Sequence, residues 1–263
     1  MSASVPELSF CIPCHNEEGN LAELIRQIED AAAKTGKTYE IVVTDDRSSD
    51  RSWEVLGELA RSRPHLRAFR LDRNSGESAA SYTAITRARG AVVVTIDGDL
   101  QNDPADLPKF LKALETADCV CGTRQGARHE GDSWLKNVTS LISNGIRSAV
   151  LGDSVTDAGC TYRAFRRECF TGIPFFKGVH RFIPIIMAFR GRKVVEVPIT
   201  NRERSYGTSH YGFGLLSRKG AIMDMLGVRW LRSRMIRFEV AESWPKDKIA
   251  SAAVGEPPRD AAE

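Results

Sequence analysis

Apolar and polar positions alternate along the first 120 residues in blocks that predict a repeated strand–helix unit. Four short, continuous apolar runs are typical of buried strands, and they cover residues 8–14, 39–44, 66–71 and 91–96. Three segments have the spacing or composition of helices. Two of them cover residues 20–33 and 52–60. The third is an alanine-rich stretch that follows the turn at 74–76 and runs to Arg89, where Gly90 ends it. Strands that alternate with helices predict an α/β fold with a mostly parallel sheet covered on both faces.

The second half of the chain has a less regular pattern. We expect a helix over 135–151, a strand over 193–198 and a polar, arginine-bearing loop over 201–211. Residues 212–238 form an amphipathic, basic segment, and the tail from about residue 243 has the composition of a disordered terminus. The expected organisation therefore has three parts, at 1–200, 201–240 and 241–263.

Composition narrows the class of protein. Hydrophobic residues make up 42% of the 263 residues and charged residues 27%, so a packed core can form. No apolar run approaches the length of about 18 residues that a membrane span needs. The N-terminus has neither the basic nor the apolar region of a secretory signal. We therefore expect a cytoplasmic globular protein.

Six cysteines include the C-x-x-C pair Cys11 and Cys14, a spacing found in redox and zinc sites. No second C-x-x-C and no histidine pair at zinc-finger spacing accompany it, and a cytosolic chain keeps its thiols reduced. We expect the cysteines to be small buried residues at strand ends.

The net charge of +3 hides an asymmetry between the two halves of the chain. Residues 1–120 carry 14 Lys and Arg against 20 Asp and Glu, whereas residues 121–263 carry 23 against 14. An acidic half suits metal coordination and a basic half suits phosphate or an anionic surface; the alternative is chance clustering of solvated charges.

Polar clusters follow three of the predicted strands, at 15–18, 45–50 and 97–99. Nucleotides bind open α/β sheets beyond the carboxyl ends of the strands, which is where these clusters fall. The sequence has no G-x-G-x-x-G after a strand and no G-x-x-x-x-G-K-[ST], so an ordinary dehydrogenase or P-loop enzyme is disfavoured.

Asp97 and Asp99 directly follow the most hydrophobic predicted strand. Because successive side chains of a strand point to opposite faces, we expect both carboxylates to point the same way, with Gln101 one step further. Such oxygen ligands suit Mg²⁺ or Mn²⁺, which would keep open positions for a diphosphate. The alternative is an Asp-rich turn that caps the helix starting near Pro104.

Asp45 and Asp46 follow the second predicted strand and could hydrogen-bond a base and ribose hydroxyls, or cap the next helix. Glu17 could bond ribose hydroxyls or lie in the first turn of its own helix. His15 fits a polar loop residue better than a ligand. For Asp45 and Asp46, and for Glu17, the residues alone leave both roles open.

These clusters belong to longer motifs. They resemble four motifs of family 2 glycosyltransferases: P-x-x-N-E at 13–17, D-D-G-S-x-D at 45–50, R-N-x-G at 73–76 and D-x-D-L-Q at 97–101. Later motifs are similar to those of polyprenyl-phosphate glycosyltransferases, the dolichol-phosphate mannose synthase group and its bacterial undecaprenyl-phosphate relatives; they lie at 122–124, 157–163, 180–184, 196–198 and 202–211. The resemblance covers residues 7–230.

The resemblance implies a GT-A fold, an open, Rossmann-like sheet that binds a nucleotide-sugar together with Mg²⁺ or Mn²⁺. The residues that it assigns to the nucleotide are Pro13, Glu17, Asp45 and Asp46, and those that it assigns to the metal and diphosphate are Asp97, Asp99 and Gln101. Residues of the loop that would close over the diphosphate and acceptor are Arg202, Arg204 and Ser209.

The resemblance also implies an acceptor site. Arg124 would meet a lipid phosphate, with Arg128 as a looser candidate. Asp157 and Arg163 would lie beside the sugar, where Asp157 could orient the acceptor or a sugar hydroxyl; its alternative role is a structural ion pair with Arg163. The residues expected to take part in the reaction are thus Asp99, Arg124 and Asp157.

Two positions depart from the family pattern. Arg47 stands where the family has glycine, which adds a side chain near the nucleotide pocket. His210 stands where the family usually has lysine, so acceptor or diphosphate affinity is expected to depend on pH near neutrality.

The expected reaction is the transfer of a sugar from a nucleotide diphosphate to a polyprenyl monophosphate, with inversion of the anomeric carbon. By resemblance, a UDP-sugar and undecaprenyl phosphate are favoured. The alternatives are a family 2 enzyme with a polysaccharide, protein or soluble acceptor, a nucleotidyltransferase, and a non-enzymatic adaptor at a membrane surface. We expect no nucleic-acid partner, and an oligomer is compatible with the sequence.

Many relatives continue into membrane helices, whereas this sequence has no apolar run of that kind. We therefore expect this chain to reach its lipid by attachment to the cytoplasmic face of the membrane. Between residues 202 and 238, eight basic residues face two acidic ones, and apolar residues that include Trp230 lie among them. This pattern is typical of an interfacial helix. The alternatives are an ordinary amphipathic helix packed on the domain and a subunit interface.

Overall fold

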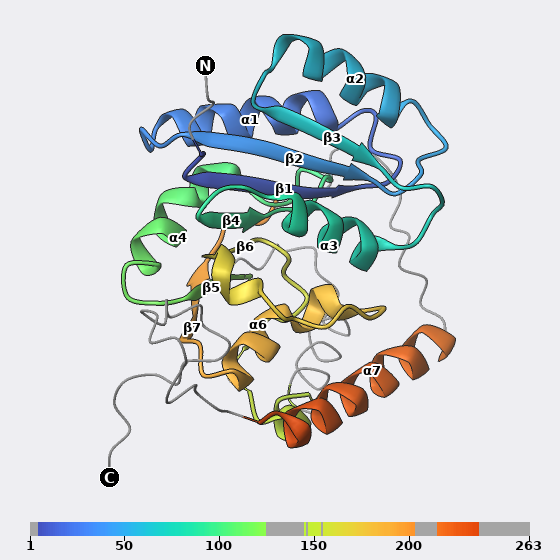
Figure 1. Ribbon diagram of the computed structural model, residues 1–263, viewed down its shortest axis with the longest axis vertical. Coiled ribbons are helices and arrows are strands. Elements are labelled where there is room, and N and C mark those ends of the chain that lie inside the picture. Colours follow the sequence, from blue (N-terminus) through green and yellow to red (C-terminus); the bar gives the residue numbers. More distant parts are fainter. Residues whose placement is uncertain (1–4, 125–144, 146, 154, 203–214, 237–263) are drawn as a thin grey trace, which may run out of the picture.

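The computed structural model describes residues 5–124, 145, 147–153, 155–202 and 215–236, and Figure 1 shows their helices and strands. The strands are β1 (Leu8–Cys14), β2 (Tyr39–Asp45), β3 (Leu66–Arg70), β4 (Val92–Thr95), β5 (Cys119–Thr123), β6 (Arg163–Arg166) and β7 (Val194–Pro198). The α-helices are α1 (Leu21–Ala33), α2 (Ser52–Ser62), α3 (Glu77–Arg87), α4 (Leu107–Ala113), α6 (Val179–Phe189) and α7 (Leu215–Arg234). Two short 3₁₀ helices are η1 (Pro104–Asp106) and η2 (Arg167–Phe170).

The strands form one seven-stranded sheet in the order β3-β2-β1-β4-β6-β5-β7. β1 pairs in parallel with β2 and β4, β2 with β3, and β5 with β7, whereas β6 runs antiparallel to both of its neighbours. The predicted mostly parallel sheet is therefore confirmed. Because β1, β2 and β4 are parallel, the loops that follow them leave the sheet at the same edge.

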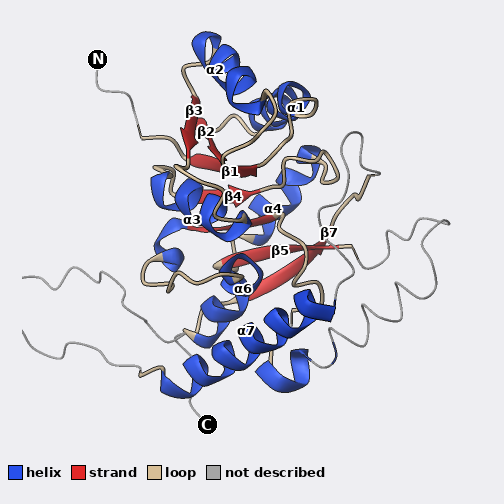
Figure 2. Cartoon of the chain, turned by 90° about the vertical axis from the view of Figure 1, so that its right-hand side faces the viewer, coloured by secondary structure: helices blue, strands red, loops and turns tan. Residues whose placement is uncertain are grey.

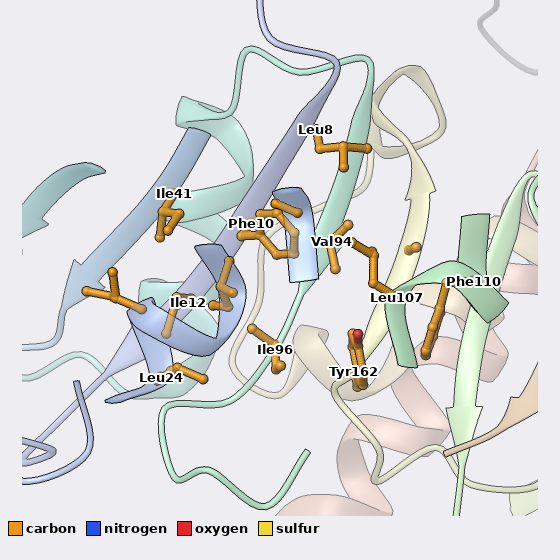
Figure 3. Close-up of a cluster of buried hydrophobic side chains, with 14 of the residues drawn as sticks. Leu8, Phe10, Ile12, Leu24, Ile41, Val94, Ile96, Leu107, Phe110 and Tyr162 are labelled. Carbon is orange, nitrogen blue, oxygen red and sulfur yellow. The ribbon is translucent and has the colours of Figure 1, made fainter. Parts of the chain in front are cut away.

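Helices cover both faces of the sheet, as the alternating pattern predicts. On one face, α1, α2 and α4 cover the sheet over a core that includes Phe10 and Ile12 (Figure 3). On the other face, α3 and α6 pack over a second core that includes Cys11 and Phe165. Since neighbours along a strand point to opposite faces, one strand supplies both cores.

The predicted elements of the first 120 residues are present, with ends that differ by one or two residues, and the difference at the end of α3 has a physical reason. The helix ends at Arg87 instead of Arg89, and Ala88 is already extended. Gly90 therefore does not terminate the helix. A Cβ at Gly90 would lie 2.7 Å from the backbone carbon of Leu8, so the glycine is needed for the close approach of the chain to β1.

The second half contains β5, β6 and α6, for which the sequence pattern gave no expectation. Of the predicted helix at 135–151, residues 147–151 are described and helical, and most of the rest lies outside the described residues. The predicted tail over 241–263 also lies outside them. The amphipathic segment is present as α7, which lies beside α6 (Figure 2).

All six cysteines are buried and unpaired, as expected for small core residues. Burial raises the pKa of the Cys14 thiol above its usual range, which keeps it protonated and unreactive. Within the described part of the chain, no helix has the length and apolar character that a bilayer crossing requires.

Candidate functional site

Three loops meet at the carboxyl edge of the sheet. The loop after β1 is tied to the loop after β2, because the Asn16 amide N–H donates to Ser48 Oγ at 2.9 Å and the Asn16 side-chain oxygen accepts from the Ser49 N–H at 2.8 Å. The loop after β4 lies against the first one: a Cβ at Gly98 would meet Glu17 Cγ at 3.3 Å. The structure thus brings Glu17, the Asp45–Asp46 pair and the Asp97–Asp99 pair to one edge.

Asp45 has a structural place within this edge. Its side chain is fully buried, with Oδ2 2.9 Å from Arg70 Nε and Oδ1 accepting from the Ser48 N–H at 3.1 Å. This ion pair and this hydrogen bond close the turn in which Arg47 takes a positive φ of 58°. The carboxylate therefore shapes the pocket wall more directly than it presents itself to a ligand.

Asp46 joins two of the sequence motifs. Its two carboxylate oxygens accept from the backbone N–H groups of Ser75, at 2.7 Å, and Gly76, at 2.8 Å. Asp46, in the D-D-G-S-x-D motif, therefore holds the R-N-x-G turn at the start of α3 against the edge of the sheet. Asp45 and Asp46 do not cap α2, whose N-cap residue is Arg51; of this cluster, Asp50 lies just before the helix and accepts from the Ser52 N–H at 2.9 Å.

The acidic loop at 97–101 lies beyond β4, which ends at Thr95. The expectation that strand alternation aligns Asp97 and Asp99 is therefore wrong, because neither residue is in the strand. A tight turn sets their positions instead: Leu100 has a positive φ of 63°, and the Gln101 N–H donates to Asp99 Oδ1 at 3.1 Å. A bulky residue in this backbone region is strained, and such strain is common at functional sites. The alternative for Asp97 and Asp99, a cap of the following helix, does not apply to them, because Asp103 caps η1.

Negative charge accumulates around Asp97. Burial, together with the carboxylates of Glu77 and Asp99, raises the pKa of Asp97 to about 7. A cation at this place would relieve that cost, and the donor set of Asp97, Asp99 and Gln101 offers only oxygen atoms of the kind that Mg²⁺ and Mn²⁺ prefer. The residues therefore fit a divalent ion. Within the described ranges, no group of three or more His, Cys, Asp or Glu side chains forms a closed metal cage.

Arg124 and Asp157 form a forked ion pair at the end of β5. Arg124 Nε and Nη2 donate to the two Asp157 oxygens, each at 2.8 Å. Burial of Asp157 opposes its ionisation, but the guanidinium outweighs burial and lowers the pKa of the carboxyl. Asp157 thus pairs with Arg124, whereas the sequence-based alternative had paired it with Arg163.

Arg163 lies in the core. It is 2% exposed, and its guanidinium donates to the backbone carbonyls of His180 and of Ala158, the latter at 3.0 Å. The described contacts therefore give Arg163 a role in fixing the backbone around Asp157, and they do not place its guanidinium at an open sugar site.

Arg202 reaches the site with its backbone. Its N–H donates to the carbonyl of Gln101 at 2.8 Å, whereas its side chain turns to α1, where Nη1 donates to Gln27 Oε1 at 2.8 Å and Nη2 pairs with Asp103. The remaining predicted residues of this loop, and the looser acceptor candidate, lie outside the described residues; they are Arg204, Ser209, His210 and Arg128.

Two carboxylates near the site were not predicted from the sequence. Glu77 opens α3 and influences the pKa of Asp97. Glu196 on β7 accepts hydrogen bonds from residues 156 and 157. The position of Glu77 directly after the R-N-x-G motif, and the presence of Glu196 in the E-V-P motif, were the only available signals.

Known proteins share this sequence pattern and this fold. The chain matches the family described as Glycosyl transferase family 2 over residues 9–173, which contains the three loops and the first part of the acceptor-side motifs. It is 37% identical over 207 residues to an undecaprenyl-phosphate 4-deoxy-4-formamido-L-arabinose transferase from Edwardsiella ictaluri. That match covers 78% of this chain and 63% of the relative, so the chain spans less than two thirds of the length of that protein.

Solved structures share the fold at low sequence identity. Glucosyl-3-phosphoglycerate synthase from Mycobacterium tuberculosis, in complex with Mn²⁺, UDP and product, has a TM-score of 0.62 at 19% identity, over 88% of this chain and 81% of that one. A mannosyltransferase from Pyrobaculum calidifontis, in complex with GDP-mannose and Mn²⁺, has a TM-score of 0.57 at 18% identity, over 89% and 66%. With its GT-A arrangement of sheet and carboxyl-edge loops and a family match over more than half its length, the chain belongs to glycosyl transferase family 2.

Proposed function

We propose that the chain transfers a sugar from a nucleotide diphosphate-sugar to a polyprenyl monophosphate, with inversion of the anomeric carbon. One observation carries the proposal: the acidic loop at 97–101, which follows β4, and Arg124, which follows β5, lie at the same edge of the sheet, because β4 and β5 both run antiparallel to β6. The loop suits the metal-bound diphosphate of a donor, and the arginine suits the phosphate of an acceptor.

The acceptor chemistry needs little help from a base. The second pKa of a phosphate monoester is about 6, so its oxygen is largely ionised at neutral pH. In the proposed step, that oxygen forms a bond to the anomeric carbon while the bond to the nucleoside diphosphate breaks. Arg124 would orient the phosphate through forked hydrogen bonds, and Asp157 would hold Arg124.

On the donor side, Pro13, Glu17, Asp45 and Asp46 would form the nucleotide end of the pocket. Asp97, Asp99 and Gln101 would hold the divalent cation, whose charge would offset that of the departing nucleoside diphosphate. The donor diphosphate and water would complete the ligand set. Arg202, Arg204 and Ser209 would close this side of the site.

The name of the Edwardsiella ictaluri relative supports an undecaprenyl-phosphate acceptor, and the UDP complex of the mycobacterial synthase supports a UDP-sugar donor. A lipid acceptor also implies a membrane surface as partner, at the cytoplasmic face where nucleotide-sugars are present. The exposed apolar side chains of α7 support this part of the proposal: Ile222, Met223, Leu226 and Trp230 are each 47–66% exposed.

The test is an assay of UDP release from a panel of UDP-sugars with Mn²⁺, with and without undecaprenyl phosphate. We expect release only with the lipid, near-complete loss in Asp99→Ala, and a higher acceptor KM in Arg124→Ala with little change in donor KM. Glu115→Ala, at an exposed position, is the matched control and should behave as wild type.

Other outcomes of the same assay identify the rival functions. Turnover with a soluble, protein or polysaccharide acceptor but not with the lipid would assign a different acceptor class. Release of inorganic diphosphate would indicate a nucleotidyltransferase. Vesicle binding without any turnover would indicate a membrane adaptor, and full activity of Asp99→Ala would refute the proposed metal site.

A further inference from the structure

Glu196 connects the rigid sheet to the acceptor side of the site. It lies on β7, directly opposite Cys121 in the parallel pairing with β5. Its Oε1 accepts from the backbone N–H groups of Thr156, at 2.9 Å, and Asp157, at 3.2 Å, and its Oε2 accepts from Thr156 Oγ1 at 2.7 Å. Three hydrogen bonds to one carboxylate therefore fix the short segment that carries Asp157.

Asp157 in turn fixes Arg124. Besides the two forked bonds, the Arg124 backbone N–H donates to Asp157 Oδ2 at 3.3 Å. A Cβ at Gly159 would lie 3.3 Å from Arg124 Nη2, so the chain leaves just enough room for the pair. Glu196, Asp157 and Arg124 thus form a continuous series of contacts from the sheet to the guanidinium.

The forked pair occupies only one edge of the guanidinium. Asp157 binds the Nε and Nη2 edge, and among the described residues no hydrogen bond or ion pair involves Nη1. The Arg124 side chain is 42% exposed, whereas that of Asp157 is 14% exposed. An anion can therefore approach the Nη1 side while the negative charge of Asp157 stays on the other edge.

We propose that Glu196 is a positioning residue for the acceptor phosphate, acting through Thr156 and Asp157 to hold Arg124 in its binding orientation. The inference rests on the proposed function and deepens it by assigning acceptor affinity to a residue that does not touch the acceptor. A free arginine side chain loses rotamer entropy on binding. Because the series of contacts orders Arg124 beforehand, phosphate binding avoids part of that cost.

The carboxylate of Glu196 suits this role better than an amide would. It offers only acceptors, and all three groups that face it donate. In Glu196→Gln, one oxygen can keep both backbone N–H bonds while the amide NH₂ faces the Thr156 hydroxyl, which can accept. We therefore expect partial function in Glu196→Gln and a larger loss in Glu196→Ala.

The test measures two dissociation constants on the full chain by titration calorimetry, one for farnesyl monophosphate and one for UDP with Mn²⁺. Glu196→Ala should weaken farnesyl phosphate binding about tenfold, equivalent to about 1.4 kcal/mol, and leave UDP binding within about twofold. Glu196→Gln should lie between Glu196→Ala and wild type. Glu115→Ala is the control for loss of an exposed carboxylate.

A double-mutant cycle separates positioning from general damage to the fold. In an Asp157→Asn background, Glu196→Ala should add less than about twofold, because its effect passes through Asp157. An equal effect in both backgrounds, or equal loss of UDP binding, would overturn the inference. If Glu196→Ala does not fold, the same cycle with Glu196→Gln decides.

The same titrations distinguish failure of the inference from failure of the proposed function. Wild-type protein that binds UDP but no farnesyl phosphate would refute the lipid-phosphate acceptor and the inference with it. Wild-type binding of farnesyl phosphate that is unchanged in Glu196→Ala would refute the inference alone.

Discussion

Arg47 shows how one residue can depart from a family pattern and keep the fold. The turn after β2 requires a positive φ at this position, 58°, where the family motif has glycine. A left-handed conformation costs a residue with a Cβ about 1–2 kcal/mol, whereas glycine adopts it freely but loses more entropy on folding, by about 0.5–1 kcal/mol. The hydrogen bond of Asp45 with the Ser48 N–H and its ion pair with Arg70 hold the turn despite this cost.

We therefore expect Arg47→Gly to raise the free energy of unfolding by up to about 1 kcal/mol. Arg61→Gly is the matched control, because Arg61 is an exposed residue inside α2, where glycine should lower the stability by a similar amount. Urea denaturation of both variants measures the two effects. Destabilisation by both would contradict the assignment of strain to Arg47.

Two motif residues that are 21 positions apart in the sequence, Arg163 and Pro184, are connected through the backbone carbonyl of His180. Pro184 lies inside α6 and has no N–H for the carbonyl of His180, four residues earlier. The buried guanidinium of Arg163 donates to that carbonyl instead. The arginine of the D-x-G-C-x-x-R motif and the proline of the H-R-F-I-P motif thus complement each other.

This pairing predicts a non-additive double-mutant cycle. Arg163→Met should cost about 1–3 kcal/mol of stability, because it leaves buried carbonyls without donors. In a Pro184→Ala background the helix can supply its own N–H to His180, so the same substitution should cost about 1 kcal/mol less. Denaturant unfolding of the four proteins gives the coupling, and additive costs would show that the proline and the arginine act independently.

At the residue scale, the sequence predicted that the polar clusters at 15–18, 45–50 and 97–99 follow strands at the carboxyl edge of the sheet, but not what their side chains contact. Asp46 was correctly expected at the sheet edge, yet its bonds to Ser75 and Gly76 join positions about thirty residues apart. Glu196 was part of a motif without a role, since its partners at 156 and 157 become neighbours only when β7 pairs with β5. Such contacts depend on the topology, which local patterns do not contain.

At the scale of elements, prediction succeeded where hydrophobic runs are continuous and failed where they are not. β1, β2 and β4 are buried on both faces and have apolar runs that can be recognised directly. β6 has only Ala164 and Phe165 between two arginines, although it lies in the middle of the sheet. α6 contains an internal proline, which argues against a helix unless another donor serves the freed carbonyl.

The helix α7 has two faces with different surroundings. Val228 is 1% exposed and packs into the second core, and Arg229 and Arg232 donate to the carbonyls of Val150 and Leu151. Part of the positive charge counted in the sequence is therefore bound to the protein itself. The remaining apolar face, with Leu226 at 47% and Trp230 at 62% exposure, is not covered by the described residues.

We expect the double substitution Leu226→Gln and Trp230→Gln to weaken binding to anionic vesicles at least about tenfold, because full burial of each apolar side chain contributes about 1.5–3 kcal/mol. The thermal unfolding temperature should change little, since both side chains are largely exposed. Sedimentation with phosphatidylglycerol vesicles at low salt measures the effect. Unchanged vesicle binding, or a dimer that the substitutions dissociate, would refute the membrane role of this face.

At the scale of the whole molecule, the two ends of the sheet differ in how their charges are compensated. At the amino end, the buried Glu40 accepts from Ser9 Oγ at 2.7 Å and pairs with Arg67 and Arg89. Burial opposes ionisation of Glu40, but these bonds outweigh it and lower its pKa. At the carboxyl end, burial and the neighbouring carboxylates of Glu77 and Asp99 raise the pKa of Asp97. One end is thus internally balanced, while the other has an excess of negative charge that suits a cationic ligand.

The buried groups also determine how the stability of the whole molecule depends on pH. His180 is 7% exposed and shares a 2.7 Å hydrogen bond with Ser78 Oγ. Burial, with the charges of Arg181 and Arg163, lowers its pKa to about 3. In the unfolded chain a histidine has a pKa of about 6.5, so the unfolded state takes up the proton first as the pH falls. The contribution of His180 to stability should therefore be constant above pH ~6.5 and decrease below it, by at most about 1.4 kcal/mol per pH unit. The raised pKa of Asp97 acts with the opposite sign below about 7, so the effect of His180 is measured against a variant of His180.

Glu40 acts in a lower window with the same sign. Its folded pKa lies below that of the unfolded chain, so its contribution is present above pH ~4.5 and is lost as the pH falls through the folded value. We expect His180→Gln to remove the upper window while leaving the lower one, because glutamine can still accept from Ser78 and does not titrate. Urea unfolding at pH 7.5, 6.5, 5.5, 4.5 and 3.5 tests this: the two proteins should differ by a constant above pH ~6.5, the variant should become relatively more stable below it, and both should lose the contribution of Glu40 below pH ~4.5. Parallel profiles over the whole range would show that His180 does not set the acid sensitivity of the fold.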